Sequence, residues 1–248
     1  MQLRTIRLAA AGLVALLALT ACGDDTSASE PVTVFAAASL TESFTTIGKN
    51  FETANPGMKV TFNFAGSSAL ATQINEGAPA DVFASASPKN MAVVTEAGTP
   101  TTFVKNQLVI AVTKGNPKGI AALADLTKPD LKLALCAEAV PCGAAAKTAL
   151  GASGVKLTPV TLEQDVKAAL SKVKLGEVDA AVVYRTDAKA SATDVDAVEF
   201  PESAKAINDY PIVVLKNAAN PTGAQSFIDY VLSADGIKVL TEAGFQAP

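Results

Sequence analysis

The sequence predicts an α/β protein of two lobes, each built on a mainly parallel sheet flanked by helices. From residue 31 onward, short apolar runs alternate with helical patterns, which is typical of parallel βαβ units. Two strongly apolar strands, near 107–113 and 210–216, separate two such sets of elements and are expected to join the lobes. We therefore place the first lobe at 32–112 and 216–248, and the second at 113–215.

The first 21 residues are expected to be a lipoprotein signal peptide. Arg4 and Arg7 form a basic region, and the apolar stretch Leu8–Leu19 is too short to span a bilayer as a helix. The sequence Leu-Thr-Ala-Cys, which ends at Cys22, matches a lipobox, in which the cysteine is acylated and becomes the new N-terminus. An uncleaved anchor or an ordinary signal peptide is the alternative. Residues 22–31 then form a polar tether without apolar periodicity.

Composition excludes several classes of function. The formal net charge is −4, and −6 without the two arginines of the leader, which argues against nucleic acid as a partner and against electrostatic membrane binding. The absence of histidine removes Ser-His-Asp and Cys-His catalysis and histidine-based metal sites. Besides Cys22, the chain has Cys136 and Cys142, which outside the cytoplasm predict a disulfide. A free or metal-binding pair is the alternative.

The first lobe is expected to begin with the strand 32–35 and a helix that opens at Ser39. Ser39 and Glu42 fit a capping box. The apolar positions of this helix fall on one face: Leu40, Phe44, Ile47 and Phe51. The next expected elements are a strand at 59–64, a helix that ends at Gly77, a strand at 81–84 and a helix from Ser87 to Gly98.

The second lobe repeats this alternation. Its expected elements are strands at 107–113 and 131–136, a helix at 144–150, a strand at Val160, a helix at 166–173 and a strand at 178–184. The strand 209–215 returns the chain to the first lobe, and two helices, at 224–232 and 234–243, close the sequence.

Ser39 and Ser67 are the candidate site residues of the first lobe. Each follows a strand and small residues, and each opens a helix, where free backbone N–H groups and the helix dipole attract an anion. Strands one and two of a parallel sheet bring both serines to the same carboxyl edge, where α/β proteins bind ligands. A plain N-cap is the alternative for each serine taken alone.

The second lobe offers three comparable positions. Cys142 precedes a helix, Val166 opens another, and Tyr184 ends a buried strand. Tyr184 taken alone is expected to be a strand-end tyrosine whose hydroxyl faces water. Asp165 is expected to cap the helix that Val166 opens or to serve as an acid of its first turn.

Five segments resemble, in their order and spacing, the periplasmic molybdate-binding proteins of ABC importers. They are VFAAASLTESF, FNFAGSSALATQI, EGAPADVFASAS, EQDVKAAL and AAVVYRTDA, and the closing FIDYVLSADGIKVLTEAGF is similar to the C-terminal helices of the wider class. The resemblance covers Pro31 to Pro248. It implies a periplasmic-binding-protein-like fold of type II, with two crossover strands.

The resemblance also implies a function. The chain would be a monomeric, non-enzymatic lipoprotein, anchored through Cys22 on the extracytoplasmic side of the cell membrane. It would capture molybdate, and tungstate with it, between the lobes and deliver the ion to an ABC permease without any cofactor. The molybdenum would be bound as its oxyanion, with no protein ligand on the metal.

Carried over residue by residue, the resemblance implies seven hydrogen-bond donors. Ser39 and Ser67 would each offer a hydroxyl and a backbone N–H, Tyr184 its hydroxyl, and Cys142 and Val166 their backbone N–H groups. Many relatives have alanine at the position of Cys142, which a backbone donor tolerates, and a Cys136–Cys142 bridge would hold that donor. The small residues 36–38 would leave room for a large ion, and Arg185 would face away from it.

Two alternatives follow from these residues. The same scaffold could serve another oxyanion, above all sulfate, because an all-donor shell disfavours only ligands that carry a proton, such as monoprotonated phosphate. A secreted serine hydrolase using Ser39 or Ser67 is the remote alternative, which the lack of histidine and of an S-x-x-K motif disfavours. No P-loop motif is present, so energy for transport would come from a partner.

Overall fold

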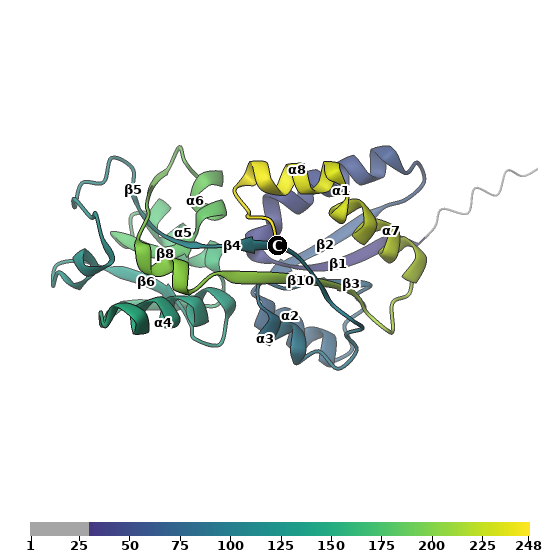
Figure 1. Cartoon of the computed structure of the whole chain (residues 1–248), viewed down its shortest axis with the longest axis horizontal. Coiled ribbons are helices and arrows are strands. Elements are labelled where there is room, and N and C mark those ends of the chain that lie inside the picture. The colour runs from purple at the N-terminus through teal and green to yellow at the C-terminus, as the bar shows by residue number, and fades with distance from the viewer. Residues whose placement is uncertain (1–29) are drawn as a thin grey trace, which may run out of the picture.

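The computed structural model describes residues 30–248, which form two lobes side by side (Figure 1). The expected signal peptide 1–21, the lipidation site Cys22 and the tether up to residue 29 lie outside the described residues. Each lobe is a five-stranded sheet covered by helices on both faces. Between residues 30 and 248, no helix combines the length and the apolar character needed to cross a bilayer.

The first lobe has the strand order β2-β1-β3-β10-β4. Its strands are β1 (Val32–Ala37), β2 (Val60–Ala65), β3 (Val82–Ala84), β4 (Thr101–Asn106) and β10 (Asn208–Val214). Its helices are the 3-10 turn η1 (Ala38–Leu40), α1 (Thr41–Ala54), α2 (Ser67–Asn75), α3 (Pro88–Ala92), α7 (Pro221–Leu232) and α8 (Ala234–Ala243). Helices α1, α7 and α8 cover one face of the sheet, and α2 and α3 cover the other (Figure 1).

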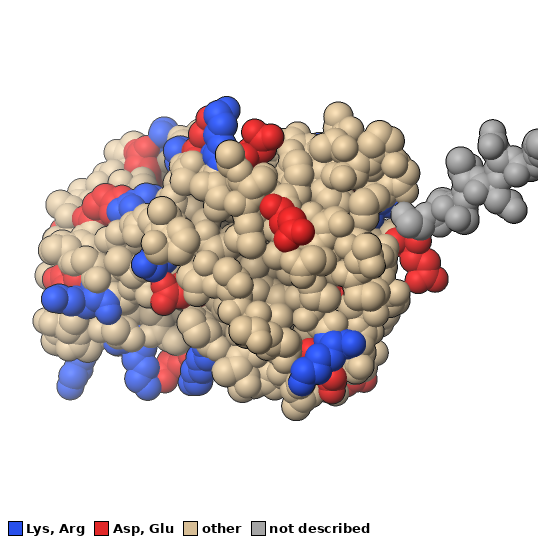
Figure 2. Space-filling view, turned by 45° about the vertical axis from the view of Figure 1, so that its right-hand side comes forward, with Lys and Arg blue, Asp and Glu red and all other residues tan. Residues whose placement is uncertain are grey.

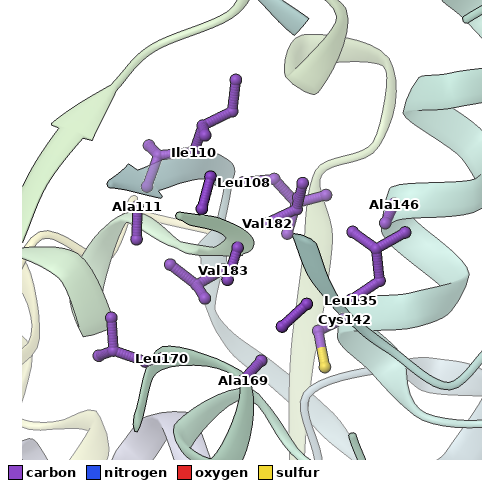
Figure 3. Packing of buried hydrophobic residues seen from close by; sticks show 14 of the residues in the cluster. Leu108, Ile110, Ala111, Leu135, Cys142, Ala146, Ala169, Leu170, Val182 and Val183 are labelled. Atoms are coloured by element: carbon purple, nitrogen blue, oxygen red, sulfur yellow. The ribbon is translucent and has the colours of Figure 1, made fainter. Parts of the chain in front are cut away.

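The second lobe has the strand order β7-β6-β8-β5-β9. Its strands are β5 (Leu108–Thr113), β6 (Leu133–Cys136), β7 (Thr161–Glu163), β8 (Ala180–Tyr184) and β9 (Val195–Val198). Its helices are η2 (Leu123–Thr127), α4 (Pro141–Ser153), α5 (Val166–Lys174), α6 (Arg185–Ala190) and η3 (Pro201–Lys205). Branched aliphatic side chains of β5 and β8 form the centre of its core, with α4 and α5 packed on them (Figure 3).

Four strands of each sheet run in one direction and the fifth runs against them. In the first lobe the opposed strand is β10, which pairs antiparallel with β3 and β4, and in the second it is β5, which pairs antiparallel with β8 and β9. These two strands bring the chain into each lobe from the other. Because the parallel strands end at the side that faces the other lobe, a strand that enters there must run away from it. The mainly parallel sheets are therefore confirmed.

The expected lobe boundaries at 112/113 and 215/216 are wrong by one strand each. Strand β5 belongs to the second sheet and β10 to the first, so the chain crosses near 106–108 and again near 206–208. Both strands contain an apolar run, VIAV in β5 and PIVV in β10, and these runs led to the expectation of connecting strands. The apolar pattern instead reflects burial on both faces, because each is an internal strand of the lobe it enters.

The expected apolar face of α1 is confirmed. It packs into the core of the first lobe, and the first turn of the helix faces the second lobe. Phe44, Ile47 and Phe51 are fully buried. Phe44 and Phe51 both pack edge-on against Phe227 of α7, with ring centroids 5.9 and 5.5 Å apart. The start of α1 is thus fixed by the first lobe's core.

Candidate anion-binding site

A small pocket lies between the lobes and is lined by residues of both. It brings together all five side chains that the sequence singled out: Ser39, Ser67, Cys142, Val166 and Tyr184. About 10 Å³ of it is open to the centre of a water-sized sphere, which is close to the space that one such particle needs. Ser67 is fully buried, and the other four are exposed by 4% or less. The pocket is therefore a small, buried space between the two lobes.

Four helix N-termini converge on this pocket. In the first lobe η1 with α1 follows β1, and α2 follows β2; in the second, α4 follows β6, and α5 follows β7. Strands β1 and β2 are neighbours in one sheet, as β6 and β7 are in the other. The first N–H groups of a helix have no intrahelical acceptor, and the helix dipole is positive there. The arrangement is therefore suited to an anion.

Neither serine is an N-cap, so that alternative is wrong for both. The Ser67 hydroxyl accepts a hydrogen bond from the backbone N–H of Ala86 at 3.0 Å, and the Ser39 hydroxyl is bonded to the Tyr210 hydroxyl at 2.8 Å. The expected capping box is also wrong, because α1 begins at Thr41 and Leu40 is its N-cap. Long-range contacts hold both serines, which leaves their hydroxyls at the pocket wall.

Tyr184 is buried, so the expectation of a hydroxyl in water is wrong. Only 1% of the residue is exposed, and its hydroxyl accepts a hydrogen bond of 2.8 Å from the Asn208 side-chain amide. Burial raises the pKa of the Tyr184 phenol well above its ordinary value, so the group keeps its proton at neutral pH. Asp165 is the cap that was expected: its carboxylate accepts from the backbone N–H of Ala168 at 2.9 Å.

A disulfide joins Cys136, at the end of β6, to Cys142, in the first turn of α4. Cys142 lies next to Leu135 of β6 (Figure 3). Its neighbour Gly143 sits so close to the strand end that a Cβ there would collide with the carbonyl oxygen of Ala137. Glycine and disulfide together hold the first turn of α4 against β6, and with it the backbone N–H of Cys142.

No lysine or arginine lines the pocket. Arg185 points elsewhere, as expected: its guanidinium bonds both carboxylate oxygens of Glu199 at 2.8 Å. Lys167, next to Val166, instead reaches across to Glu42 of the first lobe at 2.7 Å. On the face seen in Figure 2, positive and negative side chains are interspersed around a broad uncharged middle.

Three further residues bond the site hydroxyls and were not singled out from the sequence: Ala86, Asn208 and Tyr210. A fourth, Asn106, reaches them only through Tyr210. Asn208 and Tyr210 are polar groups at the start of an otherwise apolar strand, which is the signal that could have marked them. Ala36, expected in the pocket wall, is instead buried in the sheet, whereas Ala37 and Ala38 do line the pocket.

The comparison with known families decides the class of protein. The family described as bacterial extracellular solute-binding protein matches residues 32–246. The chain belongs to this family. Members of the solute-binding family are binding components, and the two-lobed fold with a pocket between the lobes is consistent with that role.

Similar proteins include both relatives and solved structures. A Mycobacterium tuberculosis protein named molybdate-binding protein ModA is 45% identical over 243 residues, which cover 93% of either chain. The periplasmic molybdate-binding protein of Azotobacter vinelandii superposes with a TM-score of 0.75 at 19% identity, over 88% of this chain and 99% of that one. The sulfate-binding protein SubI of M. tuberculosis superposes with a TM-score of 0.74 at 19% identity, over 88% of this chain and 86% of that one. The two structural likenesses establish the shared solute-binding-protein fold.

Proposed function

We propose that this solute-binding protein captures molybdate, and tungstate with it, in the pocket between its lobes. The observation that carries the proposal is a buried pocket walled by four helix N-termini and three hydroxyls. The identity of 45% to a protein named for molybdate supports the choice of ion. The ligand would be held as its oxyanion, with no protein atom on the metal.

Neutral donors suffice to bury such a dianion. The proposed shell is the hydroxyl and N–H of Ser39 and of Ser67, the N–H groups of Cys142 and Val166, and the hydroxyl of Tyr184. Hydrogen bonds to an ionised acceptor contribute about 1.5–3 kcal/mol each, which offsets the cost of removing the ion from water. Ser67 and Tyr184 accept hydrogen bonds from Ala86 and Asn208, so their own protons are left for the ligand.

Binding would be coupled to lobe closure. Two of the proposed residues, Ser39 and Ser67, belong to the first lobe, and the other three to the second. A ligand that contacts both lobes favours the closed form through that differential contact. The closed protein would then deliver the ion to an ABC permease, as a monomer anchored to the membrane through a lipid on Cys22.

Isothermal titration calorimetry with molybdate, tungstate, sulfate and phosphate tests the proposal. Molybdate should bind, and Ser67→Ala should weaken its affinity by about tenfold or more, since one bond to a charged acceptor is lost. Ser68→Ala is the matched control, because Ser68 follows in the same helix but does not line the pocket.

The other outcomes each have a meaning. Sulfate binding as tightly as molybdate would overturn the choice of molybdate, and no heat or melting shift with any oxyanion would overturn anion binding altogether. Turnover of an ester substrate that is lost in Ser67→Ala would instead support the serine hydrolase.

A further inference from the structure

We propose that Asn106 and Asn208, two buried asparagines at the crossovers between the lobes, are positioning residues that set the direction of the hydroxyl protons in the anion pocket. The inference rests on the proposed function and deepens it. In this inference, two residues that do not line the pocket make it select fully deprotonated oxyanions.

The two asparagines form a pair. Asn106 is the last residue of β4 and Asn208 the first residue of β10, and they lie opposite each other in the antiparallel register. They are exposed by 1% and 8%. They therefore mark the places where the chain leaves the first lobe and returns to it.

Asn208 is bonded to both lobes. Its side-chain amide nitrogen donates to the carbonyl oxygen of Ala86 at 2.7 Å and to the hydroxyl of Tyr184 at 2.8 Å. Both amide protons are used, so the Tyr184 oxygen acts as an acceptor, and its own proton can point to the pocket that Tyr184 lines or to the neighbouring Tyr210 hydroxyl. The N–H of the same Ala86 donates to Ser67 at 3.0 Å. One asparagine thus links a site hydroxyl of each lobe.

Asn106 acts on the third hydroxyl through Tyr210. Its side-chain oxygen accepts from the backbone N–H of Gln107 at 2.9 Å, which fixes the orientation of the amide. Its nitrogen donates to Thr186 at 2.9 Å and approaches the Tyr210 hydroxyl at 3.4 Å. Tyr210 is then disposed to donate to Ser39, 2.8 Å away, which leaves the Ser39 proton for the ligand.

The consequence is a site in which each hydroxyl already accepts one hydrogen bond from the protein and keeps its own proton for the ligand. An amide N–H cannot accept, so Tyr184 cannot turn its proton toward Asn208. A protonated oxyanion would bring an O–H that no site hydroxyl is turned to accept, and an unpaired buried donor costs affinity. Asp165 also lines the pocket, but its carboxylate is engaged with the N–H of Ala168 as the cap of α5. Without Asn208 the Tyr184 hydroxyl could rotate and accept from such a ligand. The bond from Asn208 to Tyr184 (2.8 Å) is shorter than the one from Asn106 to Tyr210 (3.4 Å), so the experiment substitutes Asn208.

The experiment measures dissociation constants for molybdate directly and for inorganic phosphate by displacement of molybdate. It uses wild type, Asn208→Ala, Tyr184→Phe and the double variant, at a pH where phosphate is mainly monoprotonated. Asn208→Ala should lower molybdate affinity by about tenfold, and the ratio of molybdate to phosphate affinity should fall by a similar factor. In the Tyr184→Phe background, Asn208→Ala should cause little further loss, because the two residues act as one unit.

Two controls keep the result interpretable. Asn63→Ala removes a partly buried hydrogen bond from Asn63 in β2 to Gln73 in α2; neither residue lines the pocket, so both affinities should stay unchanged. Asn208→Leu keeps the side-chain volume without a donor, and replaces the alanine variant if that variant does not fold.

The outcomes separate this inference from the proposed function. Equal losses for both ions, or full additivity in the double variant, would show that Asn208 is only structural and would overturn the inference. A wild-type protein that binds no molybdate would instead overturn the proposed function.

Discussion

At the scale of single residues, Asp187 in α6 is a fully buried carboxylate that faces helix α5. The Lys167 ammonium lies 3.0 Å from one of its oxygens. That contact is an ion pair by distance, yet neither oxygen receives a well-directed hydrogen bond from the part of the chain that the structure describes. Burial raises the pKa of Asp187 from 3.8 to about 6, against the opposing effect of Lys167, and Glu42 raises it further.

The raised pKa predicts how Asp187→Asn changes the pH dependence of stability. An acid whose pKa is raised in the folded state binds more protons when folded than when unfolded. Its contribution to stability is therefore fully present below its unfolded-state pKa and is lost as pH rises through about 6. Asp187→Asn has no ionisable group at this position, so its stability does not fall in this way as pH rises. Its unfolding free energy relative to wild type should therefore rise by about 2–3 kcal/mol between acid and neutral pH, since one pKa unit is worth 1.36 kcal/mol.

Urea denaturation of both proteins at several pH values measures this difference, and effects common to both proteins, from other carboxylates, cancel. A difference that stays constant from pH about 4 to about 7 would contradict the raised pKa. Asp187→Ala is not a suitable substitute, because it would add a cavity.

The same scale shows which site residues a sequence can reveal. Ser39, Ser67, Cys142, Val166 and Tyr184 stand at strand ends and helix starts, where local pattern and family resemblance both mark them. Tyr210 contacts Ser39 across 171 positions of sequence, and Asn208 contacts Ala86 across 122. Such partners are chosen by the packing of the sheet, and no local periodicity records them.

At the scale of elements, the disulfide fixes the start of α4 relative to β6. It closes a loop from Cys136 to Cys142, and in the chain-entropy model a loop this short gains about 2 kcal/mol. The Cys136→Ala/Cys142→Ala variant should lose about that much unfolding free energy in denaturant titrations. Its molybdate affinity should fall as well, because the backbone donor at position 142 becomes less constrained.

Adding a reductant to unfolded and refolded wild type is the complementary measurement. The reduced wild type should match the double-alanine variant in stability, whereas the variant itself should not respond to reductant. An unchanged ligand affinity in the variant would show that Gly143 alone holds the turn.

Most elements could be predicted, and the exceptions have physical reasons. Helices α1, α5, α7 and α8 carry a clear apolar face, so periodicity revealed them. Strand β4 was missed because its polar ends hide a buried centre at Phe103 and Val104. Helix α6 was missed because its six residues, RTDAKA, bury Thr186 and Asp187 rather than an apolar stripe.

At the scale of the whole molecule, the two lobes meet around the pocket through a few buried and a few exposed polar contacts. The buried ones run from Asn208 to Tyr184 and from Asn106 to Thr186. Lys167 pairs with Glu42, and Lys189 donates to the carbonyl oxygen of Glu242, both at 2.7 Å. Glu42 is half-exposed, so its pair contributes little, as exposed ion pairs usually contribute about 1 kcal/mol or less. Closure must therefore depend mainly on the buried bonds, on close packing of the lobes and on the ligand between them.

Gly66 is the position where that packing can be tested. It lies at the start of α2 in the first lobe, and a Cβ there would collide with the carbonyl oxygen of Gln164 in the second. Its backbone angles, φ −58° and ψ 135°, are ones that any residue adopts, so alanine is not strained by itself. Gly66→Ala should thus block closure without disturbing either lobe.

Because an open form removes the second lobe's donors from the ligand, Gly66→Ala should reduce molybdate affinity by about a hundredfold or more, the equivalent of one to two bonds to a charged acceptor. Stability without ligand should stay close to wild type.

Gly151→Ala is the matched control: that glycine lies in α4 with open space around its Cα, and alanine there should slightly stabilise the helix and leave affinity unchanged. Small-angle X-ray scattering with and without molybdate completes the test. Wild type should become more compact on binding and Gly66→Ala should not, and a variant that still closes with full affinity would show that contact across Gly66 does not limit closure.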